Sequence, residues 1–111
     1  MKTKEQVSPT LAPIYTVGVY PKLAKLCVEN GYALAVHGSL QNDLDLIAIP
    51  WTKEAVSIRK LLNQIEKTFA LKFEKKPTKR EFGRVAYAMY LSFGTCTLDF
   101  SVFPKLLDKH K

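Results

Sequence analysis

The chain has 111 residues, of which 47% are hydrophobic, 24% charged and 11% aromatic, and its formal net charge is +7. This composition is typical of one globular domain with a buried core, and it argues against intrinsic disorder. No apolar run approaches the ~20 residues of a membrane span, and the polar start of the chain lacks the apolar segment of a signal peptide. The sequence therefore predicts a cytoplasmic protein with no membrane partner.

Cysteine content and charge distribution narrow the function classes further. Cys27 and Cys96 are far apart and neither belongs to a CxxC pair. We expect two reduced thiols, because this pattern fits neither a disulfide framework nor a zinc site. Much of the positive charge lies between residues 72 and 84. Such a segment attracts nucleic acid or nucleotide phosphates, although a solvated basic surface explains the charge equally well.

The first third of the chain predicts an arm followed by a helix. Residues 1–13 are polar and contain two prolines, so we expect a flexible N-terminal arm before a single domain over residues 14–111. Residues 14–20 fit either a helix or a strand. A helix is expected to begin at Pro21, since proline is favoured in the first turn, and to end at residues 30–31, Asn-Gly.

Two short apolar runs come next, over residues 32–36 and 44–49, and each predicts a buried strand. Thr52 is the expected N-cap of a second helix over residues 53–69. Apolar side chains recur at helical spacing through this helix, which predicts one buried face.

The last third of the chain predicts a strand pair. Residues 71–73 are a candidate short strand, and residues 74–81 form a charged loop. Residues 83–93 and 96–103 are rich in aromatic and β-branched residues, and the Gly-Thr between them predicts an antiparallel pair. The order of elements predicts an α/β (α+β) fold, with a mixed sheet of about four to five strands and helices mainly on one face.

Asp43 and Asp45 are the most informative acidic residues. Alternation along a strand places both on one face and their leucine neighbours on the other. Adjacent carboxylates at the start of an apolar strand repel each other, and a bound Mg²⁺ relieves that repulsion. Asp99 lies in a similar pattern, so neighbouring strands would bring three acids together, as in two-metal phosphoryl-transfer sites. The competing interpretation is that Asp43 and Asp45 are turn residues and Asp99 faces solvent.

Polar and basic residues near these acids are candidates for phosphate contacts. Gly38 and Ser39 come shortly before Asp43, and such a turn presents backbone amides and a hydroxyl to a phosphate. His37 precedes them and is a second candidate donor, with a partly buried structural role as the alternative. Arg80 and Arg84 precede the strand expected to pair with the Asp99 strand, where they would reach an anionic substrate or lie in a solvated loop.

Three short motifs together resemble the DNA polymerase beta-like nucleotidyltransferase superfamily. They are Val36-His37-Gly38-Ser39, Asp43-Leu44-Asp45-Leu46 and Leu98-Asp99-Phe100. The order of elements over residues 21–104 is also similar, and residues 37–51 resemble small uncharacterised phage and prophage proteins of this type. The resemblance implies a minimal nucleotidyltransferase-like fold and a phage or prophage origin.

The resemblance also implies a role for each motif residue. Gly38 and Ser39 would hold the phosphates of a nucleoside triphosphate, Asp43 and Asp45 would bind two Mg²⁺ (or Mn²⁺) ions, and Asp99 would complete the second metal site and help activate an attacking hydroxyl. The superfamily reaction transfers a nucleotidyl group to a hydroxyl and releases pyrophosphate. The acceptor is open, with nucleic acid as one candidate.

A function without catalysis stays open beside this one. On the same fold, a phage accessory module would bind a nucleotide, a nucleic acid or a protein without turning it over. We also expect a homodimer, in which the second chain lines part of the acidic cleft and directs Arg80 or Arg84 toward the phosphates.

Overall fold

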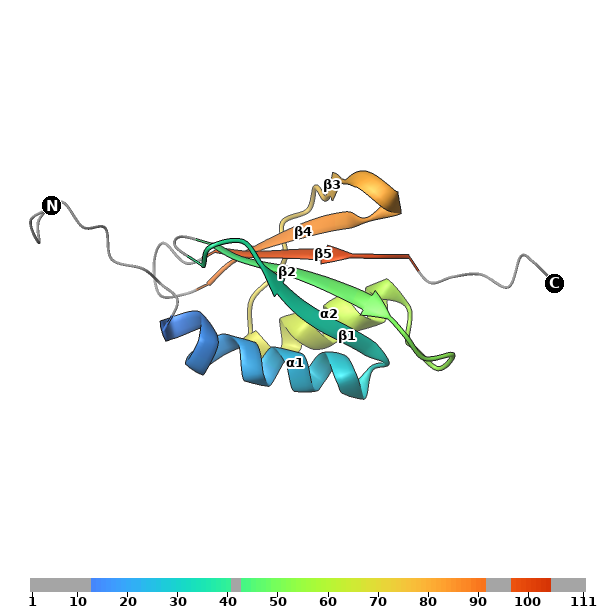
Figure 1. Ribbon diagram of the computed structural model, residues 1–111, viewed down its shortest axis with the longest axis horizontal. Coiled ribbons are helices and arrows are strands. Elements are labelled where there is room, and N and C mark those ends of the chain that lie inside the picture. Colours follow the sequence, from blue (N-terminus) through green and yellow to red (C-terminus); the bar gives the residue numbers. More distant parts are fainter. Residues whose placement is uncertain (1–12, 41–42, 92–96, 105–111) are drawn as a thin grey trace, which may run out of the picture.

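The computed structural model describes residues 13–40, 43–91 and 97–104 (Figure 1). Over these residues, a five-stranded sheet has the order β1-β2-β5-β4-β3. Its strands are β1 (Tyr32–His37), β2 (Asp43–Pro50), β3 (Thr78–Lys79), β4 (Val85–Tyr90) and β5 (Thr97–Val102). β2 and β5 are parallel and the other pairs are antiparallel. The predicted mixed sheet is confirmed, as is the antiparallel pairing of β4 with β5.

The two longest helices lie on one side of this sheet (Figure 1). They are α1 (Tyr20–Glu29) and α2 (Ile58–Phe69), and a π-helical segment, η2 (Ile14–Val19), continues directly into α1. The segment that the sequence left open between helix and strand is therefore helical. Its Tyr15 is fully buried, and the Tyr15 hydroxyl accepts a hydrogen bond of 3.1 Å from the backbone N–H of Thr97 in β5. No helix in the described parts of the chain is long and apolar enough to cross a membrane.

The predicted start of the second helix is wrong by five residues. Ser57, not Thr52, is the N-cap of α2, and its Oγ accepts a hydrogen bond of 3.2 Å from the N–H of Lys60. The Thr52 carbonyl instead accepts from the N–H of Ala55, closing a turn at 3.2 Å. Both residues are good caps, and only the packing of the chain after β2 decides between them.

The predicted strand over residues 71–73 is also wrong. This segment forms no ladder, and the Phe73 N–H donates to the Glu66 carboxylate of α2 at 2.8 Å. The short edge strand β3 lies a few residues later, inside the predicted charged loop, where it pairs with β4. The residues of β3, Thr78 and Lys79, are exposed and polar, so a search for alternating apolar residues does not detect this strand.

The core lies between the helices and one face of the sheet. Leu44, Leu46 and Ala48 of β2 and Leu98 and Phe100 of β5 are fully buried on this face. Cys27 of α1 belongs to the same core as a free thiol, and burial raises its pKa to about 12. The expected N-terminal arm, apart from Pro13, and Cys96 lie outside the described residues.

Candidate functional site

Asp45 and Asp99 lie directly opposite each other in the parallel pair β2–β5. In the same row across the sheet, His37 of β1 lies opposite Asp45, and Ala88 of β4 lies opposite Asp99. Directly opposed residues point to the same face, and neighbouring strands are about 4.8 Å apart. The expected adjacency of the Asp45 and Asp99 strands is therefore confirmed.

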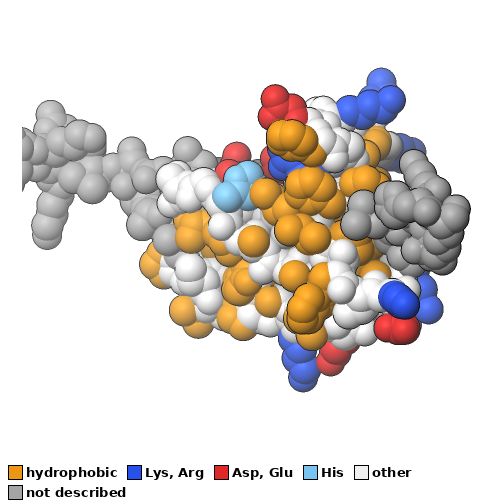
Figure 2. Space-filling model, turned by 45° about the vertical axis from the view of Figure 1, so that its right-hand side comes forward, with side chains coloured by type: hydrophobic (Ala, Val, Ile, Leu, Met, Phe, Trp, Pro, Cys, Tyr) orange, Lys and Arg blue, Asp and Glu red, His pale blue; other side chains and the backbone are white. Residues whose placement is uncertain are grey.

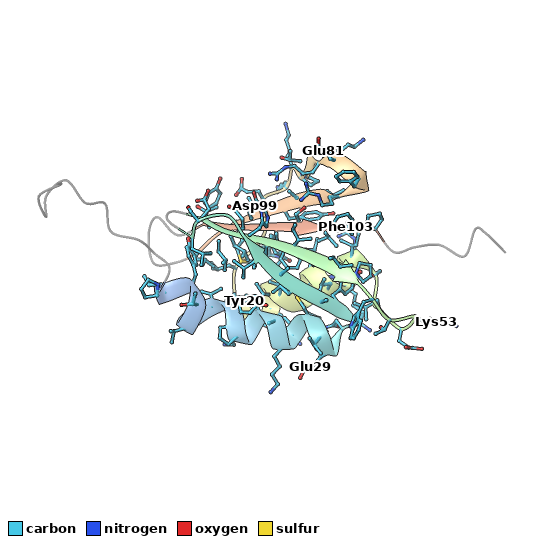
Figure 3. The ribbon with its side chains drawn as sticks, in the orientation of Figure 1. Tyr20, Glu29, Lys53, Glu81, Asp99 and Phe103 are labelled. Carbon is cyan, nitrogen blue, oxygen red and sulfur yellow. The ribbon has the colours of Figure 1, made fainter. Side chains whose placement is uncertain are left out.

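Asp43 is on the same face, one row further along. It is opposite Thr97 of β5, which is in turn opposite Tyr90 of β4. This is the face of the sheet away from α1 and α2, and Figure 3 places Asp99 on that side. Figure 2 shows red, blue and pale blue side chains gathered there beside orange hydrophobic ones. We call this face of the sheet, with Asp43, Asp45 and Asp99, the open face.

Gly38 brings the turn after β1 against the Asp45 carboxylate. Its φ is +81°, in the left-handed region that side chains disfavour. A Cβ added at this position would lie 2.6 Å from Asp45 Oδ2. The absence of a side chain therefore lets the turn approach the Asp45 carboxylate closely. Ser39, the second residue of the predicted phosphate turn, follows this glycine and is exposed.

The charges of the two neighbouring acids act on Asp45. The pKa of Asp45 is raised, first by partial burial and then by the negative charge of Asp99, with a smaller contribution from Asp43. His37 and Arg80 oppose the rise. The repulsion is of the kind that a bound divalent cation relieves.

A turn after β3 directs two arginines of the same chain toward β5. The Arg80 N–H donates to the Arg84 carbonyl at 2.9 Å, across the short 3₁₀ segment η3 (Glu81–Gly83). Arg80 Nη2 is 3.2 Å from Asp99 Oδ2, and Arg84 Nη1 donates to the Ser101 Oγ at 3.2 Å. Both predicted basic residues therefore contact the open face. Ser101 is the one polar residue in this contact that the sequence analysis did not single out, although it shares the parity of Asp99.

The carboxylates fit a magnesium ion that takes most of its ligands from elsewhere. Among the described residues, no three His, Cys, Asp or Glu side chains are grouped closely enough to hold a metal by themselves. Mg²⁺ often uses only one or two carboxylates and completes its shell with water and substrate phosphates. Asp45 and Asp99 are two such carboxylates on neighbouring strands, and Arg80 contacts Asp99.

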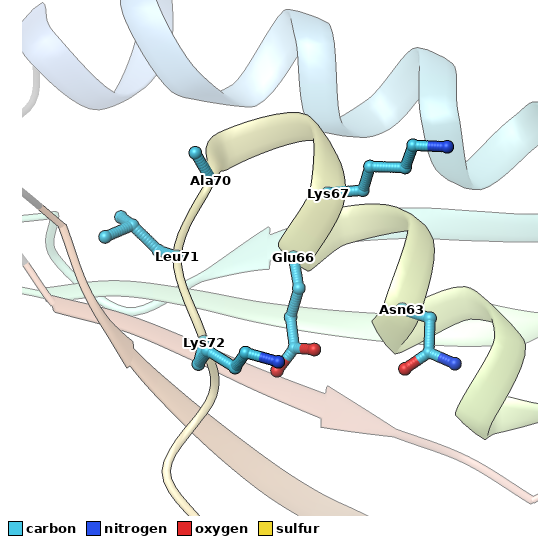
Figure 4. Close-up of a pocket in the computed structure, with 6 residues that line it drawn as sticks. All are labelled: Asn63, Glu66, Lys67, Ala70, Leu71 and Lys72. Atoms are coloured by element: carbon cyan, nitrogen blue, oxygen red, sulfur yellow. The ribbon is translucent and has the colours of Figure 1, made fainter.

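One hollow of the described chain lies away from these acids. It has a volume of about 380 Å³ and is formed at the end of α2 and the segment after it (Figure 4), and its lining residues include Asn63, Glu66 and Lys72. Its single carboxylate, Glu66, already accepts the Phe73 N–H.

Comparison with known proteins agrees with this geometry at the level of the fold. The structure is similar to that of the Cid1 poly(U) polymerase with Mg and 3'-dATP bound, with a TM-score of 0.52 and 16% sequence identity. The match covers 88% of this chain and 33% of the polymerase chain, so this chain spans about a third of that protein. No family model and no curated protein sequence matches. The chain therefore has a nucleotidyltransferase-like fold.

The raised pKa of Asp45 predicts how stability depends on pH. A carboxyl whose pKa is higher in the folded state than its ordinary 3.8 is destabilising when ionised. This cost is absent at low pH and appears as the pH rises through the raised pKa. Asp45→Asn should therefore increase the free energy of unfolding relative to the wild type, and the difference should grow from pH 4 to pH 7.

Urea denaturation across this range measures the difference. Glu29→Gln, at the end of α1, removes the same charge away from the open face and is the control. An equal pH-dependent increase in the free energy of unfolding of both variants would show that net charge, and not the position of Asp45, is responsible.

Proposed function

We propose that this protein binds a nucleoside triphosphate with Mg²⁺ (or Mn²⁺) on the open face and transfers its nucleotidyl group to a hydroxyl acceptor, releasing pyrophosphate. The observation that carries the proposal is the register of β2 and β5, which sets Asp45 opposite Asp99 beside the Gly38 turn. The nucleotidyltransferase-like fold supports it.

Each residue of the open face has a proposed role. Asp45 and Asp99 would hold the metal together with water and phosphate oxygens, and Asp43, one row away on the same face, would add negative charge beside it. When bound, the metal would neutralise triphosphate charge and favour attack at phosphorus. The Gly38-Ser39 turn would donate backbone and hydroxyl hydrogen bonds to phosphate oxygens, with His37 beside it. Asp99 would accept the proton of the attacking hydroxyl, and Arg84 would contact phosphate oxygens.

Arg80 has a double role in this proposal. Its guanidinium supplies positive charge beside Asp99 when no metal is bound, so it competes with a cation for the same oxygen. An incoming triphosphate offers Arg80 a stronger bidentate partner and frees the carboxylate.

The alternative function is a binding module on the same fold that does no chemistry. The Arg80–Asp99 ion pair favours it, because that pair satisfies the third acid without a metal. A homodimer, a cytoplasmic location and a phage or prophage origin belong to either proposal as predictions. Both arginines reach β5 within one chain, so a second chain is not needed to supply them.

Thermal unfolding with added metal and nucleotide tests the proposal. At Mg²⁺ ten times above its Kd, mass action adds about 1.4 kcal/mol, which raises the Tm by roughly 5 °C for a domain of this size. Asp43→Asn/Asp45→Asn should abolish this rise. Mass spectrometry of the same samples with nucleoside triphosphates should show a nucleotide adduct that depends on Mg²⁺.

A matched variant controls for loss of charge. Glu29→Gln/Glu54→Gln removes two carboxylates away from the open face and should keep the rise. A rise of equal size in the Asp43/Asp45 variant would refute metal binding at this site. Metal-dependent nucleotide binding without pyrophosphate release on any hydroxyl acceptor would favour the binding module.

A further inference from the structure

A basic hollow of about 620 Å³ lies along the edge of the sheet next to the open face. It is formed by the segment after α2 together with β3 and β4, and its lining residues are Lys72, Phe73, Glu74, Lys75, Lys76, Thr78, Ala88 and Tyr90. Three lysines and one glutamate give this lining a net positive charge. We call it the lysine groove.

The lysine groove adjoins the acidic residues through β4. Ala88 lies opposite Asp99, and Tyr90 lies opposite Thr97, so both groove residues belong to the open face. The groove is therefore one strand away from β5. A ligand strand lying in the groove would approach Asp99 from the β4 side. The Gly38 turn lies on the other side of Asp99, beyond β2.

The groove combines the two features that single-stranded nucleic acids require. The exposed lysines would contact successive phosphates, and Tyr90, which is 58% exposed, offers an aromatic ring on which a base stacks. An acidic peptide would use the lysines equally well, so the exposed ring of Tyr90 beside them is the feature that favours a nucleic acid.

The wall of the groove is held in place before any ligand binds. The Glu74 N–H donates to the Ala88 carbonyl at 2.7 Å, so the lysine segment continues along the free edge of β4. The ring of Phe73 is buried, with its centroid 6.1 Å from that of Tyr87 and 6.0 Å from that of Phe100. A wall fixed in this way loses little conformational freedom on binding.

We infer that the lysine groove binds single-stranded nucleic acid and directs a terminal hydroxyl toward Asp99. The inference rests on the proposed function only for what happens at Asp99, since binding itself needs neither metal nor triphosphate. The inferred acceptor is a polynucleotide strand that runs along the lysine groove toward Asp99.

Fluorescence anisotropy with a labelled 12-nucleotide single strand, in EDTA, tests binding by itself. Lys75→Ala/Lys76→Ala should weaken binding and make the dependence of log K on log salt shallower by about 1.4, or 0.7 for each lost phosphate contact. Tyr90→Ala should weaken binding by roughly 5- to 150-fold with the salt dependence unchanged, as loss of one stacked base predicts. Circular dichroism confirms that each variant is folded.

The control variant is Lys25→Ala/Lys60→Ala, which removes the same charge from exposed positions on α1 and α2. Equal weakening in this control, or no effect of Tyr90→Ala, would overturn the inference. Equally tight binding of polyglutamate would also overturn it. Asp43→Asn/Asp45→Asn should retain strand binding, so loss of the metal site and loss of the groove are separate outcomes.

Discussion

Replacing Phe100 with alanine should lower the free energy of unfolding by about 3–5 kcal/mol, and the Tm by more than about 10 °C. Phe100 is fully buried at the centre of β5, between Leu46 of β2 and Tyr87 of β4. Its ring also packs against Phe73, at 6.0 Å between centroids. Strands and an aromatic ring that are already packed collapse little into the space left by the lost side chain.

Phe82→Ala is the matched control, because it removes the same side chain from a position that is 82% exposed. It should change stability by less than about 0.5 kcal/mol. Chemical denaturation measures both variants. A similar loss in the two would mean that the central sheet does not form the core described here.

Replacing Gly38 with alanine should abolish the stabilisation by Mg²⁺. A left-handed φ costs a residue with a side chain about 1–2 kcal/mol, and the new Cβ would overlap Asp45 Oδ2 at 2.6 Å. The flexible carboxylate gives way more easily than backbone, so Asp45 should move and the fold should survive. We expect a modest fall in Tm without metal and no rise when Mg²⁺ is added.

Two other glycines provide controls for this effect. Gly18 has nothing within 4 Å of an added Cβ, so Gly18→Ala should keep the metal response. Gly31→Ala would meet the Ala55 Cα at 2.5 Å at a φ of +89°, so it should be strongly destabilising through the backbone alone. A full metal response in Gly38→Ala would show that the Asp45 carboxylate is not a ligand.

The sequence by itself determined the faces of the elements. Alternation around Asp43-Leu44-Asp45-Leu46 and Leu98-Asp99-Phe100 separated acids from core residues, as the burial of the leucines and Phe100 confirms. Helical periodicity likewise identified α2. These features follow from the two repeat lengths of the backbone, 2.0 and 3.6 residues, which each segment expresses locally.

Only the tertiary structure decided which segments meet. The parallel pairing of Asp45 with Asp99 joins residues far apart in the chain, and nothing in either segment specifies its neighbour or its direction. The Arg80–Asp99 ion pair, the choice of Ser57 over Thr52 as a cap and the lysine groove depend on the same long-range packing. Such contacts form because burial of the assembled core offsets the entropy lost in closing long loops. This free-energy sum depends on the whole chain and cannot be calculated from any single motif.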